Sequence, residues 1–189
     1  MIYIENKKKK EKTLLDKYPN ALILDITSKG EWPWVKLSPF YPHGNIPIPP
    51  YPTEYYAMSV EGIWQGLKVF ETENIDRSKF EIKNMKGIKR TVRKFGKPLG
   101  HRNGVDGEDL LDYATARKKI YLRAYTWVLD NKVNDIVEVL KYFVTKQDLV
   151  LLDYNTNEDL ENFTKPLSHA GLVKKYLIKK YPELATFDI

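Results

Sequence analysis

The chain of 189 residues contains no cysteine. This absence excludes disulfide bonds, thiolate nucleophiles and zinc sites built on thiolate ligands. Only three histidines are present, scattered along the chain, and neither an HExxH motif nor a paired histidine–carboxylate cluster occurs. We therefore expect no metal centre and no cofactor.

Long apolar runs are also missing. No window approaches the roughly 20 apolar residues that a membrane-spanning helix needs. The opening residues, MIYIENKKKKEK, are basic but lack the apolar stretch that follows in a secretory signal. With 42% hydrophobic and 30% charged residues, the chain is predicted to be one soluble, cytoplasmic domain over residues 1–189 without a membrane partner. Residues 1–12 are expected to be a solvated first helix or a frayed basic arm.

The formal charge of +6 favours phosphate-bearing partners, either a nucleotide or a nucleic acid. Most of the excess lies in Lys7–Lys12, Lys83–Arg102 and Lys174–Lys180. The second of these runs contains three glycines and can cradle phosphates, although Walker and Rossmann spacings are absent. Zinc-finger, homeodomain and RRM signatures are absent too. Lysine-rich surfaces also serve solubility alone.

The most informative stretch is residues 57–71, AMSVEGIWQGLKVFE, which has helical periodicity. Ser59 suits the N-cap position. Gly62 and Gly66 form a bare-backbone face that favours close packing against another element, and each costs about 1 kcal/mol relative to alanine. A separate apolar face is formed by Val60, Ile63, Leu67 and Phe70.

A narrow polar stripe remains on this predicted helix. It consists of Glu61, Gln65 and Lys68, with Trp64 at its border. A helix covered on two sides is largely buried, so these polar groups need partners, which a cleft with a bound ligand would supply. The alternative is that the charges form structural pairs or face solvent.

The rest of the chain favours an α/β or mainly α fold. Ala21–Thr27 and Leu149–Tyr154 are predicted strands, and Ile136–Val144 is a predicted helix. Residues 32–53 are rich in proline and aromatic residues, which favours an ordered, extended loop. A long helix is predicted from Leu110 to about Leu129.

Two residues in these elements are candidate site residues. Arg117 lies on the apolar stripe of the long helix, where it either extends its guanidinium to solvent or binds an anion. Asp153 ends a strand, a position that often faces a binding crevice, although an Asx-turn explains it equally well.

Three segments resemble the NADAR (NAD- and ADP-ribose-related) superfamily. Residues 59–68, SVEGIWQGLK, resemble its signature helix, S/T-V-E-x-x-Y/F/W-Q-x-x-K. Residues 37–42, LSPFYP, resemble its L-S-N-F-Y-P segment with Pro39 in place of asparagine. Residues 96–102, GKPLGHR, resemble its A-x-x-L-G-R segment. Asp153 is followed by Tyr-Asn-Thr, without the tryptophan and glycine of the late D-x-x-W-G motif, which indicates a divergent branch.

The resemblance implies a compact domain with a buried signature helix that cleaves an N-glycosidic bond to a ribose phosphate. The substrates it implies are a ribosylaminopyrimidine phosphate or ADP-ribose attached to guanine in DNA. Glu61 would stabilise the oxocarbenium-like state. Lys68 would act as a fixed cation or form a Schiff base with ring-opened ribose, and Asp153 would be a second acid.

The other candidate residues would bind the substrate. Trp64 would stack on a base or fill the core, and Gln65 would orient ribose hydroxyls. Arg102 and Arg117 are candidate diphosphate ligands. The remaining substrate-binding candidates are Ser59, Phe40 and Tyr41.

Two other functions fit the same residues. One is a noncatalytic protein that binds NAD, ADP-ribose or a related nucleotide in the same cleft. The other is a basic nucleic-acid-binding protein that uses Lys83–Arg102, with the polar stripe purely structural. DNA contact is compatible with the enzymatic hypothesis as well.

Overall fold

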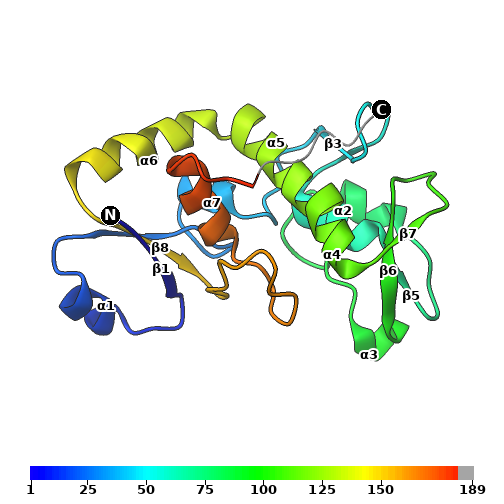
Figure 1. Cartoon of the computed structure of the whole chain (residues 1–189), viewed down its shortest axis with the longest axis horizontal. Helices are drawn as coiled ribbons and strands as arrows, with labels where there is room; N and C mark the ends of the chain where they lie inside the picture. The colour runs from blue at the N-terminus through cyan, green and yellow to red at the C-terminus, as the bar shows by residue number, and fades with distance from the viewer. Residues whose placement is uncertain (183–189) are drawn as a thin grey trace. The chain divides into compact units, whose positions relative to one another are not determined.

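The computed structural model describes residues 1–182, and these residues combine helices with small sheets in a mixed α/β arrangement (Figure 1). Their contacts divide the chain into two compact units. The first comprises Met1–Ser38 and the described residues from Val133 onward, and the second comprises Pro39–Lys132. The single domain that we expected from the sequence stays a prediction. Within residues 1–182, no helix is long and apolar enough to cross a membrane.

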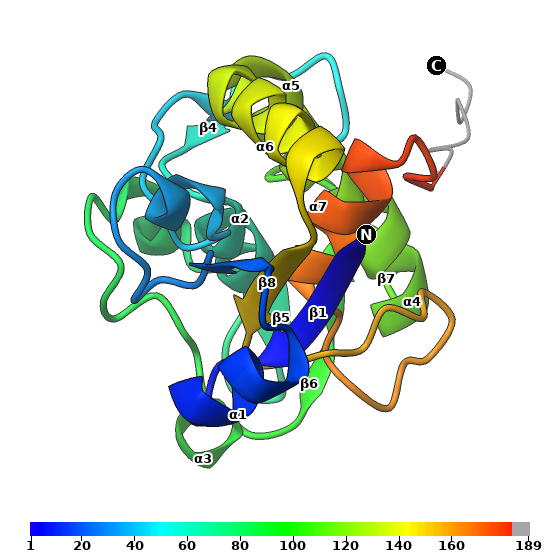
Figure 2. The ribbon, with the colours of Figure 1, turned by 90° about the vertical axis from the view of Figure 1, so that its left-hand side faces the viewer.

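The first unit is built on a three-stranded parallel sheet in the order β1-β8-β2 (Figure 2). The strands are β1 (Ile2–Asn6), β2 (Leu22–Asp25) and β8 (Leu149–Asp153). Every residue of β8 is buried, as expected for the apolar central strand of a parallel sheet. The two predicted strands of this unit, Ala21–Thr27 and Leu149–Tyr154, are thus confirmed with slightly shorter bounds.

Helices complete this unit. Helix α1 (Glu11–Lys17) packs Leu14 against Val150 and Leu152 of the central strand. The 3₁₀ helix η1 (Trp34–Leu37) follows β2, and α6 (Asn134–Lys146) confirms the helix predicted at Ile136–Val144. Helix α7 (His169–Leu177) contacts both β1 and β8.

Residues 1–12 do not form a frayed arm, because Ile2–Asn6 pairs along the full length of β8. The basic run that follows is held by the buried Glu5. Lys17 and Lys9 both donate hydrogen bonds to its carboxylate. Although burial opposes the change, these two bonds lower the pKa of Glu5 to about 2. The lysines therefore neutralise a buried charge.

The second unit contains a helix, two small antiparallel sheets and a long helical segment. Its sheets are β5-β6-β7 and β3-β4. Its elements are β3 (Ile46–Pro47), β4 (Tyr56–Ala57), α2 (Val60–Gly66), β5 (Lys68–Phe70), η2 (Arg77–Glu81), α3 (Val92–Phe95), β6 (Pro98–Arg102), β7 (Leu110–Leu111), α4 (Tyr113–Ala116), the π-helical η3 (Arg117–Leu122) and α5 (Arg123–Asn131).

Helix α2 is shorter than its periodicity suggests. It ends at Gly66, so Lys68 and Phe70 belong to strand β5 instead of the helix. The carbonyl groups at this end are satisfied by other segments. Arg90 donates to the carbonyls of Gln65 and Lys68, and the Asp76 N–H donates to that of Gly66. Partners from outside the helix thus replace its next turn.

The long helix also begins later than predicted. Leu110 and Leu111 pair with β6, and Asp112 caps the helix by accepting a hydrogen bond from the Thr115 N–H. Its middle, η3, is a π-helix, a variation that often occurs at functional sites.

The glycine face of α2 packs as predicted. A Cβ atom at Gly62 would lie 2.6 Å from the backbone oxygen of Lys79, and one at Gly66 would lie 2.1 Å from the Phe80 ring. Both contacts come from η2. The two glycines therefore permit η2 to approach the helix backbone.

We predict that Gly66→Ala lowers the free energy of unfolding by about 1–3 kcal/mol, because the added methyl group collides with Phe80. Urea denaturation monitored by circular dichroism measures this change. The control is Gly87→Ala, where a Cβ atom meets nothing within 4 Å and only the φ of +69° is strained. A Gly66→Ala variant as stable as wild type would contradict the close packing.

Candidate functional site

The start of α2 positions Glu61. Ser59 is the N-cap, and its hydroxyl oxygen accepts a hydrogen bond from the Gly62 N–H at 3.0 Å. The Glu61 N–H donates to the Pro39 carbonyl at 2.8 Å, which fixes the preceding loop beside the helix. The Glu61 side chain is therefore held in the first turn of a buried helix, where the helix dipole favours a carboxylate. Ser59 itself is fully buried and serves the helix cap.

Gln65 positions Glu61 instead of presenting a free amide. Its Nε2 donates to Glu61 Oε1 at 2.8 Å, and its Oε1 accepts from the Arg90 N–H at 3.0 Å. The expected role in orienting ribose hydroxyls therefore competes with these two bonds. The side chains of Glu61 and Gln65 form a buried, ordered pair one turn apart.

Lys68 joins this pair from strand β5. Burial lowers the pKa of Lys68, the Glu61 carboxylate opposes that change, and the charges of Arg90 and Lys89 add to it. The structure thus brings Glu61 and Lys68 within each other's electrostatic reach, although the two residues belong to different elements. A lysine with a lowered pKa carries a larger fraction of neutral amine near neutral pH, and the neutral amine is the form that acts as a nucleophile or general base.

Trp64 packs against side chains of its own unit. Its ring stacks on His101 of β6, with centroids 3.7 Å apart, and meets Tyr113 and Tyr121 edge-on at 5.8 and 5.7 Å. The Lys68 Nζ lies 5.7 Å from the same ring. Trp64 therefore packs between α2, β6 and the long helix, and because it is only partly buried, stacking on a base stays a prediction.

His101 is a site residue that the sequence did not reveal. It pairs with Lys68 in the β5–β6 register and is only 2% exposed. Neither ring nitrogen makes a hydrogen bond of ordinary geometry with any residue among 1–182. Burial and the charge of Lys68 lower the pKa of His101 to about 3, opposed by the backbone of Trp64. No sequence signal distinguishes this histidine from His43, because its position follows from strand pairing.

The loop before β3 places Phe40 and Tyr41 directly after Pro39, whose carbonyl binds the start of α2. Lys89 Nζ lies 5.4 Å from the Phe40 ring, and the Tyr41 ring contacts His43 at 4.7 Å. Both aromatic residues are partly buried. They remain candidate contacts for a substrate beside α2.

The two candidate diphosphate ligands are engaged within the second unit. Arg102 donates to the Glu108 carbonyl and to Asn74 Oδ1, which holds the loop after β6. Arg117 is 2% exposed; its Nη2 donates to the Tyr113 hydroxyl at 3.0 Å. Arg117 therefore does not extend its guanidinium to solvent. Arg102 donates a hydrogen bond to a backbone carbonyl of its own unit.

Asp153 belongs to the first unit, in a buried network at the end of β8. Its Oδ2 accepts from Ser168 Oγ at 2.8 Å and lies 2.9 Å from His169 Nδ1. The second ring nitrogen of His169 lies 2.9 Å from the Ile26 carbonyl. Asp153 Oδ1 also accepts from the Tyr154 N–H, as in an Asx-turn.

Asp153 and His169 each favour the charged form of the other. Although burial opposes it, His169 and Ser168 lower the pKa of Asp153 to about 2. Burial alone would lower the pKa of His169, but the Asp153 carboxylate raises it, and the net change is upward. The pair therefore joins the ends of β2 and β8 to the start of α7, and the role of Asp153 as a second acid stays a prediction.

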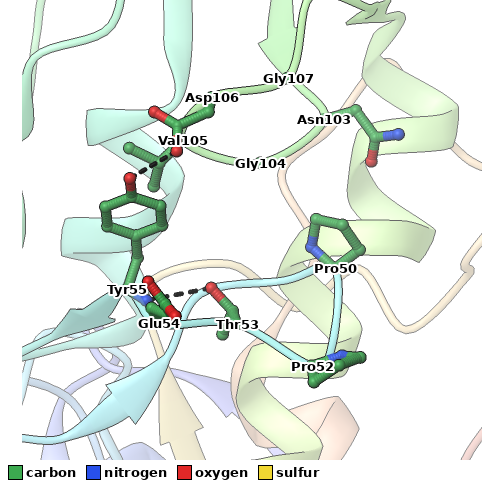
Figure 3. A pocket seen from close by; sticks show the side chains of 10 residues that line it. All are labelled: Pro50, Pro52, Thr53, Glu54, Tyr55, Asn103, Gly104, Val105, Asp106 and Gly107. Carbon is green, nitrogen blue, oxygen red and sulfur yellow. Dashed lines mark hydrogen bonds between the residues drawn. The ribbon is translucent and has the colours of Figure 1, made fainter.

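Two cavities lie in loops. In the second unit, an open cavity of about 550 Å³ is lined by Pro50 and by residues 52–55 and 103–107 (Figure 3). The Tyr55 hydroxyl donates to Asp106 across its rim, and Arg77 pairs with the same carboxylate. In the first unit, a polar cavity of about 430 Å³ is lined by Asn6 and by the loop after β8. Both volumes suit small ligands.

The side chains beside α2 can act on a substrate through a carboxylate, an amine and a neutral imidazole. Among residues 1–182, no group of three or more histidine or carboxylate side chains is placed to hold a metal ion. The chemistry available from the described side chains is therefore acid–base, nucleophilic and electrostatic.

Comparison with known proteins gives one match. The model of DUF6939, described as a family of unknown function, matches residues 6–173. Neither a curated protein nor a solved structure matches the chain.

We predict that His101→Phe removes a pH-dependent loss of stability. The unfolded chain binds a proton near the usual pKa of 6.5, whereas folded His101 stays neutral until about pH 3. The free energy of unfolding of wild type should therefore fall by about 1.4 kcal/mol for each pH unit below the unfolded pKa of this histidine. Urea denaturation of both proteins at several pH values measures the difference, and parallel pH profiles would contradict the neutral, buried imidazole.

We also predict that Asp153→Asn lowers the free energy of unfolding by about 3–5 kcal/mol, because it leaves the buried His169 without its counter-charge. The exposed Asp16→Asn is the control and should change stability by less than about 0.5 kcal/mol. If Asp153→Asn lost activity but kept full stability, the structural role would be wrong.

Proposed function

Because the chain belongs to DUF6939, a family whose function is unknown, we propose its activity from the side chains of α2 and β5. The proposed reaction is hydrolysis of an N-glycosidic bond between C1 of a ribose phosphate and a base. The observation that carries this proposal is the electrostatic coupling of the buried Glu61 to Lys68, whose pKa is lowered.

Cleavage of a C1–N bond develops positive charge on the sugar. A fixed carboxylate stabilises that charge, and Gln65 holds the Glu61 carboxylate in place. Water then adds to C1, and its proton passes to the departing base. Glu61 is the group that we assign to transition-state stabilisation.

Lys68 has two possible roles in this reaction. As a cation it neutralises a phosphate or the departing base. As a neutral amine it attacks C1 of the ring-opened sugar, the C1–N bond to the base breaks as the base departs with a proton, and a Schiff base between C1 and Lys68 remains. Water then hydrolyses this Schiff base to free sugar and amine. The pKa lowered by burial supports the second role, since it increases the fraction of neutral amine.

The resemblance of residues 59–68 to the NADAR signature helix supports the same chemistry. On this proposal, residues 39–53 of the proline-rich segment form the ordered loop beside that helix, and this loop contributes Phe40 and Tyr41. The substrate is an ADP-ribosylated or ribosyl phosphate compound. A noncatalytic protein that binds the same ligands is the alternative, and turnover separates the two.

We predict that wild type releases ADP-ribose or ribose phosphate from at least one of three substrates: ADP-ribosylated guanine in DNA, NAD, or a ribosylaminopyrimidine phosphate. Glu61→Gln should reduce the rate by at least about 10²-fold, since it removes the charge that stabilises the transition state. Mass spectrometry of the products measures turnover. Glu81→Gln, on the exposed surface of the same unit, is the matched control and should keep full activity.

Lys68 variants separate the two lysine roles. Lys68→Arg keeps the cation but cannot form a Schiff base, and borohydride should trap a sugar adduct only on a wild-type Lys68 that acts as a nucleophile. Binding without turnover, measured by calorimetry and abolished in Glu61→Gln, would replace the enzyme with a ligand-binding protein. Turnover that survives in both Glu61→Gln and Lys68→Ala would refute the proposed site.

A further inference from the structure

The positive charge of this chain is concentrated in one segment. Residues 83–102 contain eight of its 31 lysines and arginines and none of its 25 aspartates and glutamates. The remaining sequence therefore carries a formal charge of −2. The net charge of +6 is a property of this segment alone.

The other two basic runs are partly neutralised by ion pairs, although Lys8, Lys10, Lys12, Lys175, Lys179 and Lys180 form none with a described residue. In the first run, Lys7 pairs with Asp25 and Lys9 pairs with Glu5. In the last, Lys174 pairs with Glu158. Six cations of residues 83–102 are exposed and form no ion pair with any described residue: Lys83, Lys86, Lys89, Arg93, Lys94 and Lys97. We call these six side chains the basic surface.

Buried side chains anchor the segment that carries the basic surface. Ile88 and Arg90 are buried between its cations. The Arg90 guanidinium lies 4.9 Å from the Phe70 ring and 5.0 Å from the Phe95 ring, and the two rings contact each other at 5.5 Å. Helix α3, which carries Arg93 and Lys94, stands beside the start of β6 in Figure 1. The backbone that carries these cations is therefore held in place by packed side chains.

The composition of the basic surface favours a polyanion with repeated charges. A membrane-binding helix needs an apolar face, but α3 has only four residues, and Val92 and Leu99 are the large apolar side chains exposed within residues 83–102. Lysine and arginine side chains spaced along one face match the regular phosphates of a nucleic-acid strand. Phosphate contacts of this kind fix position without reading sequence.

The basic surface also extends toward the candidate site. The charge of Lys89 contributes to the lowered pKa of Lys68. A phosphate bound at Lys89 therefore lies within electrostatic reach of Lys68.

We propose that the basic surface binds the phosphate backbone of a nucleic acid. This inference does not rest on the proposed glycosidase activity, because binding is measured without turnover. The surface is defined by unpaired charge, so its affinity depends on salt more than on sequence.

Fluorescence anisotropy with labelled single-stranded and double-stranded oligonucleotides of mixed sequence tests the proposal. If all six cations neutralise phosphates, affinity for duplex should fall by about 10³-fold between 50 and 200 mM salt. The triple variant Lys86→Gln, Arg93→Gln and Lys94→Gln should weaken binding at low salt by at least about tenfold and reduce the salt slope by about 2–3.

The matched control is the triple variant Lys8→Gln, Lys10→Gln and Lys12→Gln, which removes the same net charge from exposed positions in the first unit. It should bind oligonucleotides almost as wild type does. An equal loss in both triple variants would show an effect of net charge only and overturn the proposal. Anionic phospholipid vesicles or polyglutamate bound as tightly as DNA would overturn it as well.

Discussion

The buried guanidinium of Arg90 holds together the part of the second unit in which the candidate site lies. It donates to the carbonyls of Gln65, Lys68 and Asn74, and it lies against the rings of Phe70 and Phe95. These contacts stabilise the end of α2 and the start of β5. Because the Arg90 N–H also binds the Gln65 side chain, the same residue orders Gln65 and, through it, Glu61.

This arrangement explains how a helix of seven residues carries buried polar groups. A buried polar atom without a partner costs about 1–3 kcal/mol. Glu61 and Gln65 bond to each other, and Arg90 completes the set. Within the described part of this unit, the Nε of Arg90 and both ring nitrogens of His101 are buried without a good partner, and the charge of His101 is suppressed. Groups kept at such a cost occur more often where ligands bind than in an ordinary core.

Local patterns in the sequence were sufficient to predict the N-cap at Ser59, the close packing at Gly62 and Gly66, and the strands β2 and β8. Each of these depends on neighbours within one or two turns or on a short apolar run. The end of α2 was not predictable, because the groups that replace its last turn come from residues about ten or more positions away. The pairing of Lys68 with His101 has the same cause. Asp153 was placed correctly at a strand end, but its binding of His169 requires the fold of the first unit.

The charge state of Lys68 connects these observations to chemistry. Burial, Arg90 and Lys89 favour the neutral amine, whereas Glu61 favours the ammonium ion. Arg90 is held by its bonds to backbone carbonyls. Lys89 is exposed, so an anion bound to it cancels its contribution and shifts Lys68 toward the charged form. A phosphate at Lys89 therefore strengthens the electrostatic role of Lys68 and weakens its nucleophilic role. For the glycosidase reaction that we propose, the choice between the two roles of Lys68 thus depends on where the phosphates of the substrate lie.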